Sequence, residues 1–255
     1  MLIADHGPVR VLTLNRPQAR NALNSELVEA LYAALVAADD DPSVRTVVVT
    51  GADPAFCAGV DLKEVASGGL EYFDQYQDRD CIKQVARMRK PVIGAINGAT
   101  FTGGLEMALG CDFMIASERA VFADTHARVG ILPGGGMTAR LPRLVGAATA
   151  RRLSMTGEVV DAAHAERIGL VSEVVEHDRL LGRAVEVAQQ IADVPGPTMQ
   201  AVKQIYTTGA AAIIDPALAA EQAIAGAQVI ETQGLSARYR AVSERNRRQI
   251  GDTRG

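Results

Sequence analysis

The chain has 255 residues, of which 48% are hydrophobic and 22% charged, enough to bury a sizeable core in one large α/β domain or two small ones. Its formal net charge of −4 argues against a nucleic-acid partner bound through bulk positive charge. The three cysteines form neither a disulfide framework nor a metal-ligand spacing, and neither a signal peptide nor an apolar run of membrane-spanning length is evident. We therefore expect a cytoplasmic protein with reduced cysteines, no metal and no membrane partner.

The predicted elements alternate between strand and helix in the first half of the chain. The turn signal His6-Gly7-Pro8 separates two extended runs, and Asn24 or Ser25 can cap a helix with apolar residues at helical spacing. In chain order we expect two strands within residues 2–14, a helix from 25 that ends at 39–42, a strand over 45–50, a helix over 62–89 broken near 67–69, and a strand over 92–96.

Helices dominate the second half. We expect strands over 112–116 and 120–123, a helix over 141–156, a helix from Asp161 to Gly169, an extended segment over 170–175, and helices over 178–192, 198–208, 215–231 and 234–248. Strands and helices in the first two-thirds followed by helices alone favour a parallel-sheet core with a helical tail. No internal linker is visible, so we expect one domain unit, with a core over 1–195 and a helical C-terminal region over 196–255.

Two glycine-bearing stretches each follow a predicted buried strand. Gly103-Gly104 comes after the strand over 92–96 and begins an apolar helix, and the stretch 55–63 comes after the strand over 45–50. The first N–H groups of a helix lack partners within it and lie at the positive end of its dipole. Because the two strands are consecutive, the two stretches can aim two N–H donors at one point, which is the geometry of an oxyanion hole.

An ordered set of fragments carries a family resemblance across nearly the whole chain. The fragments are Asn15-Arg-Pro17, Asn21-Ala-Leu23, Phe56-Cys-Ala-Gly-Val-Asp-Leu-Lys63, Lys90-Pro91, Asn97-Gly98, Gly103-Gly-Leu-Glu106, Cys111-Asp112, Val129-Gly-Ile-Leu-Pro-Gly134, Arg140-Leu141, Thr156-Gly157 and Gly169-Leu-Val171. This set resembles the crotonase (enoyl-CoA hydratase/isomerase) superfamily. The resemblance implies an α/β crotonase (ClpP-like) fold, in which repeated ββα units form a spiral core and a helical C-terminal region builds trimers, often paired into hexamers.

The resemblance also implies where an acyl-CoA thioester binds. The N–H groups of Val60 and Gly103 are implied to hold its carbonyl oxygen. The coenzyme A part of the substrate is implied to lie, mostly against backbone, along Ala58, Asp61, Leu62, Lys63 and Gly104, and no separate cofactor is expected. Lys63 and Arg20 are candidate phosphate partners, as are the arginines of the C-terminal helix, which in this family can approach a neighbouring subunit's coenzyme A; each is also explained as a solvated surface cation.

Proton transfer requires an acid or base beside the oxyanion donors, and Glu106 lies three residues beyond Gly103. Alternatively, Gly103-Gly104 is a tight turn and Glu106 merely complements the helix dipole. Hydratases of this family share the work between two carboxylates, but the position of the second holds His126 here. His126 could act as the acid–base, orient Glu106 or a water, or be a packed histidine without chemistry; Asp124 could supply the carboxylate instead.

Together these features predict an enoyl-CoA hydratase, which adds water to a 2-enoyl thioester. A related enolate reaction, such as double-bond isomerisation or a lyase or hydrolase step, can proceed with one carboxylate and stays open. So does a protein of another class, an acyl-CoA binding protein without turnover. Three minor features complete the analysis: Gly134–Ala139 is a weak match to a dinucleotide fingerprint, Tyr72, Phe73 and Tyr76 are candidates for a substrate tunnel, and His164 and His177 are expected to be structural.

Overall fold

The computed structural model describes residues 1–68, 79–229 and 234–252. Its larger sheet has six strands in the order β1-β2-β3-β5-β7-β10, and all neighbours run parallel except the β1–β2 hairpin. These strands are β1 (Leu2–His6), β2 (Val9–Leu14), β3 (Thr46–Gly51), β5 (Val92–Ile96), β7 (Phe113–Ser117) and β10 (Glu173–Val175). All six coincide with expected extended segments, namely the two within 2–14 and those over 45–50, 92–96, 112–116 and 170–175.

A second, smaller sheet runs alongside the first, and of its four strands only the one predicted over 120–123 was expected. It has the order β4 (Ala55–Cys57), β6 (Ala99–Phe101), β8 (Val121–Ala123) and β9 (Val160–Asp161). The pairs β3–β4, β5–β6 and β7–β8 each place one strand in the large sheet and the next in the small sheet, and a helix follows each pair. This repeat is the expected ββα unit, so the crotonase fold is confirmed.

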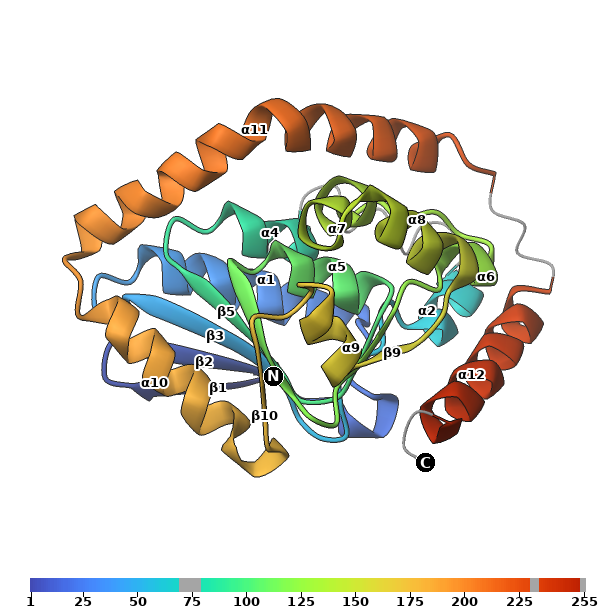
Figure 1. Cartoon of the computed structure of the whole chain (residues 1–255), viewed down its shortest axis with the longest axis horizontal. Helices are drawn as coiled ribbons and strands as arrows, with labels where there is room; N and C mark the ends of the chain where they lie inside the picture. The colour runs from blue at the N-terminus through green and yellow to red at the C-terminus, as the bar shows by residue number, and fades with distance from the viewer. Residues whose placement is uncertain (69–78, 230–233, 253–255) are drawn as a thin grey trace.

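The large sheet is buried on both faces, as a parallel sheet requires. In β3, Val47 and Val49 belong to the core cluster that includes α1 (Ser25–Asp40), whereas Val48 belongs to the cluster with α10 (Leu180–Ala192). Figure 1 shows α10 on one side of the strands and α1, α4 (Cys81–Arg87) and α5 (Gly103–Gly110) on the other. The alternation of side chains along each strand therefore divides the core into two layers.

The remaining helices connect the strands or follow them toward the C-terminus. They are the short η1 (Pro17–Ala19), α2 (Leu62–Gly68), α6 (His126–Val129), α7 (Met137–Val145), α8 (Ala147–Thr156), α9 (Ala162–Arg167), η3 (His177–Arg179), α11 (Gly196–Gly226) and α12 (Leu235–Asp252). Figure 1 shows α11 arching over α7 and α8, and α12 lying beside α2 and α6. Within the described residues, no helix is both long enough and apolar enough to cross a membrane. The division into a core and a C-terminal region at residue 195 stays a prediction.

Two predicted helix boundaries were wrong. The helix expected over 141–156 is divided into α7 and α8 at Gly146, whose φ of +80° lies in the region that favours glycine. Conversely, the two helices expected over 198–208 and 215–231 are one helix, α11, which runs through Pro216. Proline removes one N–H from the helix and crowds the preceding turn, but α11 is largely exposed, so water can solvate the carbonyl that loses its partner.

Candidate active site

The main-chain N–H group of Val60 is directed away from the strand segment with which its neighbours are hydrogen-bonded. Leu23 pairs with Val60 in an isolated parallel bridge, in which the Leu23 N–H donates to the Gly59 oxygen at 2.8 Å and the Asp61 N–H donates to the Leu23 oxygen at 2.9 Å. Because successive N–H groups of an extended chain point in opposite directions, the Val60 N–H faces away from Leu23. Among the described residues it has no hydrogen-bond acceptor.

Gly103 presents the second N–H group. It is the first residue of α5, so its N–H has no acceptor within the helix, and none is found elsewhere in the described part of the chain. The residue before it, Thr102, has φ +48° and ψ −119°, a conformation that a residue with a side chain rarely adopts. Strain of this kind persists where the surrounding structure enforces it, and it is common at functional sites.

The two loops contact each other directly. A Cβ atom at Gly59, whose φ is +94°, would lie 2.1 Å from Oγ1 of Thr102, so only glycine fits there. A Cβ atom at Gly103 would lie 3.8 Å from Cα of Gly59 and 3.9 Å from Cγ1 of Val60. The structure therefore brings the two predicted oxyanion donors, 43 positions apart in the numbering from Val60 to Gly103, to the same place.

Glu106 lies behind these donors in a buried position. Its side chain is 4% exposed, its Oε1 accepts hydrogen bonds from the N–H groups of Gly135 (2.8 Å) and Met137 (3.3 Å), and its Oε2 lies 3.7 Å from Nε2 of His126. Burial raises the pKa of Glu106, with a further contribution from the charge of Glu221, and these effects outweigh His126 and the two N–H donors. The carboxylate is thus a base whose pKa is shifted toward neutrality, as general base catalysis requires.

His126 lies between two carboxylates. Its Nδ1 is 2.7 Å from Oδ1 of Asp124, and the same oxygen accepts a hydrogen bond from the His126 main-chain N–H at 3.2 Å. Because the ionised Asp124 can only accept, Nδ1 carries a proton and Nε2 faces Glu106. Burial alone would lower the pKa of His126, but the charges of Glu106, Asp124 and Glu221 and the Asp124 hydrogen bond together raise it. The pKa of Asp124 is lowered, because its bonds to His126 and Ser154 outweigh its burial.

This arrangement narrows the alternatives left open for His126. The His126 ring lies between the carboxylates of Asp124 and Glu106, which favours a role in acid–base chemistry over simple packing. Asp124 bonds to the far side of the ring, so it supports His126 rather than replacing it as the group that faces Glu106. The site contains an acid and a base side by side.

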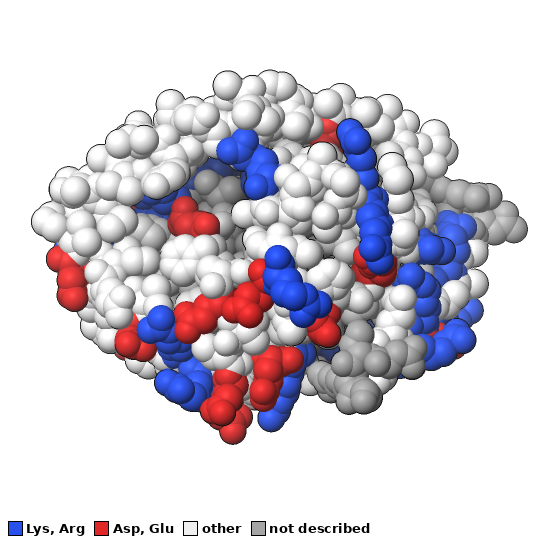
Figure 2. Space-filling view, in the orientation of Figure 1, with Lys and Arg blue, Asp and Glu red and all other residues white. Residues whose placement is uncertain are grey.

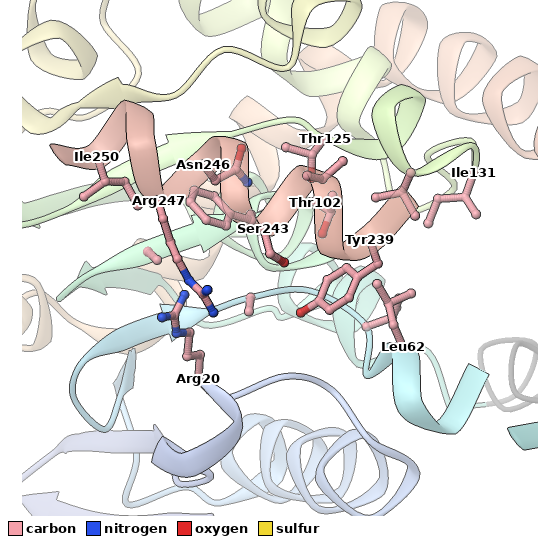
Figure 3. Close-up of a pocket in the computed structure, with 16 residues that line it drawn as sticks. Arg20, Leu62, Thr102, Thr125, Ile131, Tyr239, Ser243, Asn246, Arg247 and Ile250 are labelled. Carbon is pink, nitrogen blue, oxygen red and sulfur yellow. The ribbon is translucent and has the colours of Figure 1, made fainter. Parts of the chain in front are cut away.

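A small cavity lies in front of Val60 and is closed by α12. Its volume is about 60 Å³, and its lining includes Ala58, Val60, Leu62 and Thr102 from the core and Tyr239 and Asn246 from α12. Figure 3 shows Arg20 and Arg247 on opposite walls with their guanidinium groups pointing toward each other. The C-terminal helix thus covers the site of its own chain, and it brings one arginine to the mouth of the cavity.

The other predicted coenzyme A residues have contacts within the protein. Asp61 accepts hydrogen bonds from Nη1 of Arg16 (2.9 Å) and from the Lys63 N–H (3.0 Å). Gly104 packs on β4, because a Cβ atom there would lie 2.2 Å from the Cys57 oxygen. Asp61, Lys63 and Gly104 do not line the described cavity, so their role in substrate binding stays a prediction.

The remaining sequence features find structural explanations. Residues 134–139 form the start of α7 and do not follow a strand, and the Gly135 N–H binds Glu106 instead of a dinucleotide. His177 bonds to Ser117 (2.9 Å) and Asp53 (3.0 Å), as expected of a structural histidine. The candidate tunnel residues Tyr72, Phe73 and Tyr76 lie outside the described residues. No group of side chains suited to a metal ion occurs in 1–68, 79–229 or 234–252.

Comparison with known proteins agrees with this geometry. The family model described as enoyl-CoA hydratase/isomerase matches residues 5–237. A solved enoyl-CoA hydratase from Mycobacterium avium is 48% identical, superposes with a TM-score of 0.80, and covers 88% of this chain and 94% of its own. A probable enoyl-CoA hydratase from Rhizobium meliloti is 45% identical over 80% of this chain and 79% of its own length. A probable peroxisomal enoyl-CoA hydratase from Arabidopsis thaliana is 40% identical over 73% and 70%.

The fold, the paired N–H donors and the buried carboxylate define a crotonase-type acyl-CoA enzyme. The chain belongs to the enoyl-CoA hydratase/isomerase family.

Proposed function

We propose that the protein is an enoyl-CoA hydratase, which adds water across the double bond of a 2-enoyl-CoA. The observation that carries the proposal is the acid–base pair Glu106–His126, buried directly behind the loops that bring Val60 and Gly103 together. The two N–H groups would stabilise the enolate oxygen that forms when water attacks the thioester's β-carbon. Each such donor contributes about 3 kcal/mol to the transition state.

Glu106 and His126 have complementary roles in this reaction. Glu106 as the carboxylate takes a proton from water while the oxygen bonds to the β-carbon, and the π electrons move onto the thioester oxygen. The protonated His126 then delivers its Nε2 proton to the α-carbon as the enolate collapses, so one OH and one H are added. Asp124 stabilises the imidazolium through the 2.7 Å bond to Nδ1.

The alternatives differ in what they require of His126. A double-bond isomerase moves one proton with one base, so it can work with Glu106 alone. An acyl-CoA binding protein requires neither group. A buried base and a buried acid in contact are costly to maintain, and this cost favours a reaction that uses both.

Hydration is tested by mixing the pure protein with short and long 2-enoyl-CoA and following the loss of the absorbance of the conjugated thioester. We expect the absorbance to fall and the 3-hydroxyacyl-CoA product to form. Binding of every enoyl-CoA tested, with no loss of absorbance, would contradict the proposal and favour the binding protein.

The two facing arginines suggest how the coenzyme A part is bound. Arg20 and Arg247 line the same cavity with their guanidinium groups pointing toward each other, so an anion between them can accept hydrogen bonds from both (Figure 3). We propose that they bind a phosphate of coenzyme A, with Arg247 supplied by α12 of the same chain.

Reversing the charge of Arg247 tests this role. We expect Arg247→Glu to raise the KM for enoyl-CoA about tenfold and to leave kcat nearly unchanged. One charge-assisted hydrogen bond contributes about 1.5–3 kcal/mol, and about 1.4 kcal/mol corresponds to a tenfold change in affinity. Arg248→Glu is the matched control, because Arg248 is exposed on the same helix but does not line the cavity. An equal increase in KM in Arg247→Glu and Arg248→Glu would contradict the proposed phosphate contact.

We also propose that the protein is a homo-oligomer, a trimer or a dimer of trimers. The charged residues Lys203 and Glu221 of α11 are buried, whereas its apolar side chains Ile205 (71%), Ile213 (61%) and Ile224 (65%) are exposed. Figure 2 shows the outer surface of α11 as a nearly uncharged band above a hollow in the molecule, and a cavity of about 1130 Å³ separates the helix from the core. An exposed apolar surface of this length favours a second copy of the chain as its partner.

Charged residues on this band should break the assembly. We expect Ile205→Glu combined with Ile213→Glu to lower the mass measured by light scattering from three or six chains to a single chain of 26.9 kDa. Leu181→Glu, at an exposed apolar residue of α10, is the control and should leave the mass unchanged. A wild-type protein that elutes as a single chain would contradict the proposal.

We place the protein in the cytoplasm, supported by three free cysteines, of which Cys57 and Cys81 are buried. The names of related proteins include peroxisomal and mitochondrial ones, so the compartment is to be tested by fractionation of the source cells. Recovery of the protein in an organelle or membrane fraction would contradict this placement.

A further inference from the structure

The start of α7 is held by two carboxylates that come from distant parts of the chain. The four consecutive N–H groups of residues 135–138 donate alternately to them. The first and third donate to Oε1 of Glu106, at 2.8 and 3.3 Å. The second and fourth donate to Oε1 and Oε2 of Glu221, at 2.6 Å each. We call residues 135–138 the amide clamp.

Glu221 lies in the middle of α11, 115 positions after Glu106 in the numbering. It is 7% exposed, and besides the two amides it accepts a hydrogen bond from Oγ1 of Thr138 at 2.5 Å. Three donors to one buried carboxylate offset the cost of removing its charge from water. α11 packs on α7 through this contact, although most of α11 is exposed.

The amide clamp also determines how Glu106 is oriented. Because Oε1 accepts both N–H groups, the carboxylate is fixed with Oε2 facing Nε2 of His126. Gly135 of the amide clamp packs closely on the carboxylate, since a Cβ atom there would lie 2.9 Å from Oε2 of Glu106. Nη1 of Arg140 donates to the Gly135 oxygen at 2.8 Å and holds the same loop from the other side.

A simpler explanation is that Glu221 only caps α7. The N-cap residue, Gly136, has no side chain, and the first N–H groups of the helix need acceptors. A cap would stabilise the helix without any effect on Glu106. The alternation of bonds makes a different prediction, because the N–H groups that Glu221 holds lie between those that hold Glu106. Neither set can move without the other.

We propose that Glu221 is a positioning residue, which acts through the amide clamp to hold the Glu106 carboxylate in place and thereby couples the C-terminal helix α11 to the acid–base pair. The kinetic part of this inference rests on the proposed function, whereas the structural part does not. It follows that a change which lifts α11 from α7 also disorders Glu106, although no residue of α11 lines the cavity in front of Val60.

Amide hydrogen exchange at single-residue resolution tests the structural part without substrate. In Glu221→Gln one carboxylate oxygen is replaced by an NH₂ group, which cannot accept, so the N–H group of either Gly136 or Thr138 loses its acceptor. We expect the Gly135 and Met137 amides, which Glu221 does not touch, to exchange about tenfold faster or more. Thr138→Ala is the matched control, because it removes one bond to Glu221 and leaves all four amide hydrogen bonds in place. In this variant the four amides should exchange nearly as slowly as in the wild type. Faster exchange confined to Gly136 and Thr138 would overturn the inference.

Kinetics then tests the coupling to Glu106. We expect Glu221→Gln to lower kcat for 2-enoyl-CoA about 10- to 100-fold with little change in KM, because a small displacement of a catalytic group has effects of that size. Glu221→Asp, which keeps the charge, should recover part of the loss. In a Glu106→Gln background the same Glu221→Gln substitution should have almost no further effect on kcat.

The two experiments fail in different ways. A wild-type protein without hydratase activity would end the proposed function but leave the exchange result to decide the role of Glu221. If the wild type is active, two results would show that Glu221 does not act through Glu106. In the first, Glu221→Gln lowers kcat by the same factor in the Glu106→Gln background as in the wild type. In the second, Glu221→Gln raises KM and leaves kcat unchanged.

Discussion

Glu106→Gln is expected to lower kcat for the hydration of 2-enoyl-CoA by about 10³-fold, within the range that general acid–base groups contribute. Glutamine keeps the shape of the side chain and an oxygen that accepts from the amide clamp, but it cannot take a proton from water. Because the cavity residues and Arg247 are untouched, KM should change little. Stopped-flow absorbance of the conjugated thioester measures both constants.

The control for this substitution is Glu166→Gln on α9, where the side chain is exposed and far along the chain from the site. It should leave kcat unchanged. A Glu106→Gln enzyme with full hydratase activity would remove Glu106 from the mechanism. Equal binding of enoyl-CoA by the wild type and the variant, with turnover by neither, would favour the acyl-CoA binding protein.

His126→Ala has the second largest expected effect, a loss of about 10²-fold in hydration. The imidazolium is the acid in the proposed mechanism, and its Nε2 lies 3.7 Å from Oε2 of Glu106. In a double-bond isomerase that uses Glu106 alone, the same change would be nearly silent. The assay therefore pairs hydration of 2-enoyl-CoA with isomerisation of 3-enoyl-CoA, and a large loss in the second reaction alone would contradict the hydratase.

The pH dependence of kcat/KM tests the protonation state of the pair. The charges of Glu106, Asp124 and Glu221, with the Asp124 hydrogen bond, outweigh burial and raise the pKa of His126 above the ordinary 6.5. Activity should fall on the alkaline side as pH rises through that raised pKa, because the acid is then lost. Asp124→Asn removes one negative charge, lowers the pKa of His126 and should move the alkaline limb to lower pH. An alkaline limb that stays in place would exclude the imidazolium as the acid.

Local patterns in the sequence pointed to much of the candidate site. Gly103 and Glu106 share one short segment, and the ordered fragments around them placed Val60 and His126 in the same family pattern. The continuous run of three valines in β3 likewise predicted a buried strand, which the structure confirms. Such features are short in range, since a strand, a loop and the start of a helix are encoded within about fifteen residues.

Contacts between distant segments could not be predicted in this way. Nothing near Glu221 distinguishes it from other acidic residues of an amphipathic helix, and only the packing of α11 on α7 brings it to the amide clamp. Three short strands of the small sheet, β4, β6 and β9, were missed because two or three residues are too few to show a period, whereas β8 was predicted. Asp124 is a similar case: its residue type was noted, but its position behind the His126 ring depends on the fold.

The central claim is that the N–H groups of Val60 and Gly103 bind one thioester oxygen. Infrared difference spectroscopy measures this directly, with a 2-enoyl-CoA carrying carbon-13 at the thioester carbonyl and bound to the Glu106→Gln variant, which does not consume it. Two hydrogen bonds to the oxygen weaken the C=O bond, so we predict a stretching frequency clearly below that of the same thioester in water. A frequency equal to or above the value in water would contradict the oxyanion hole and the mechanism that depends on it.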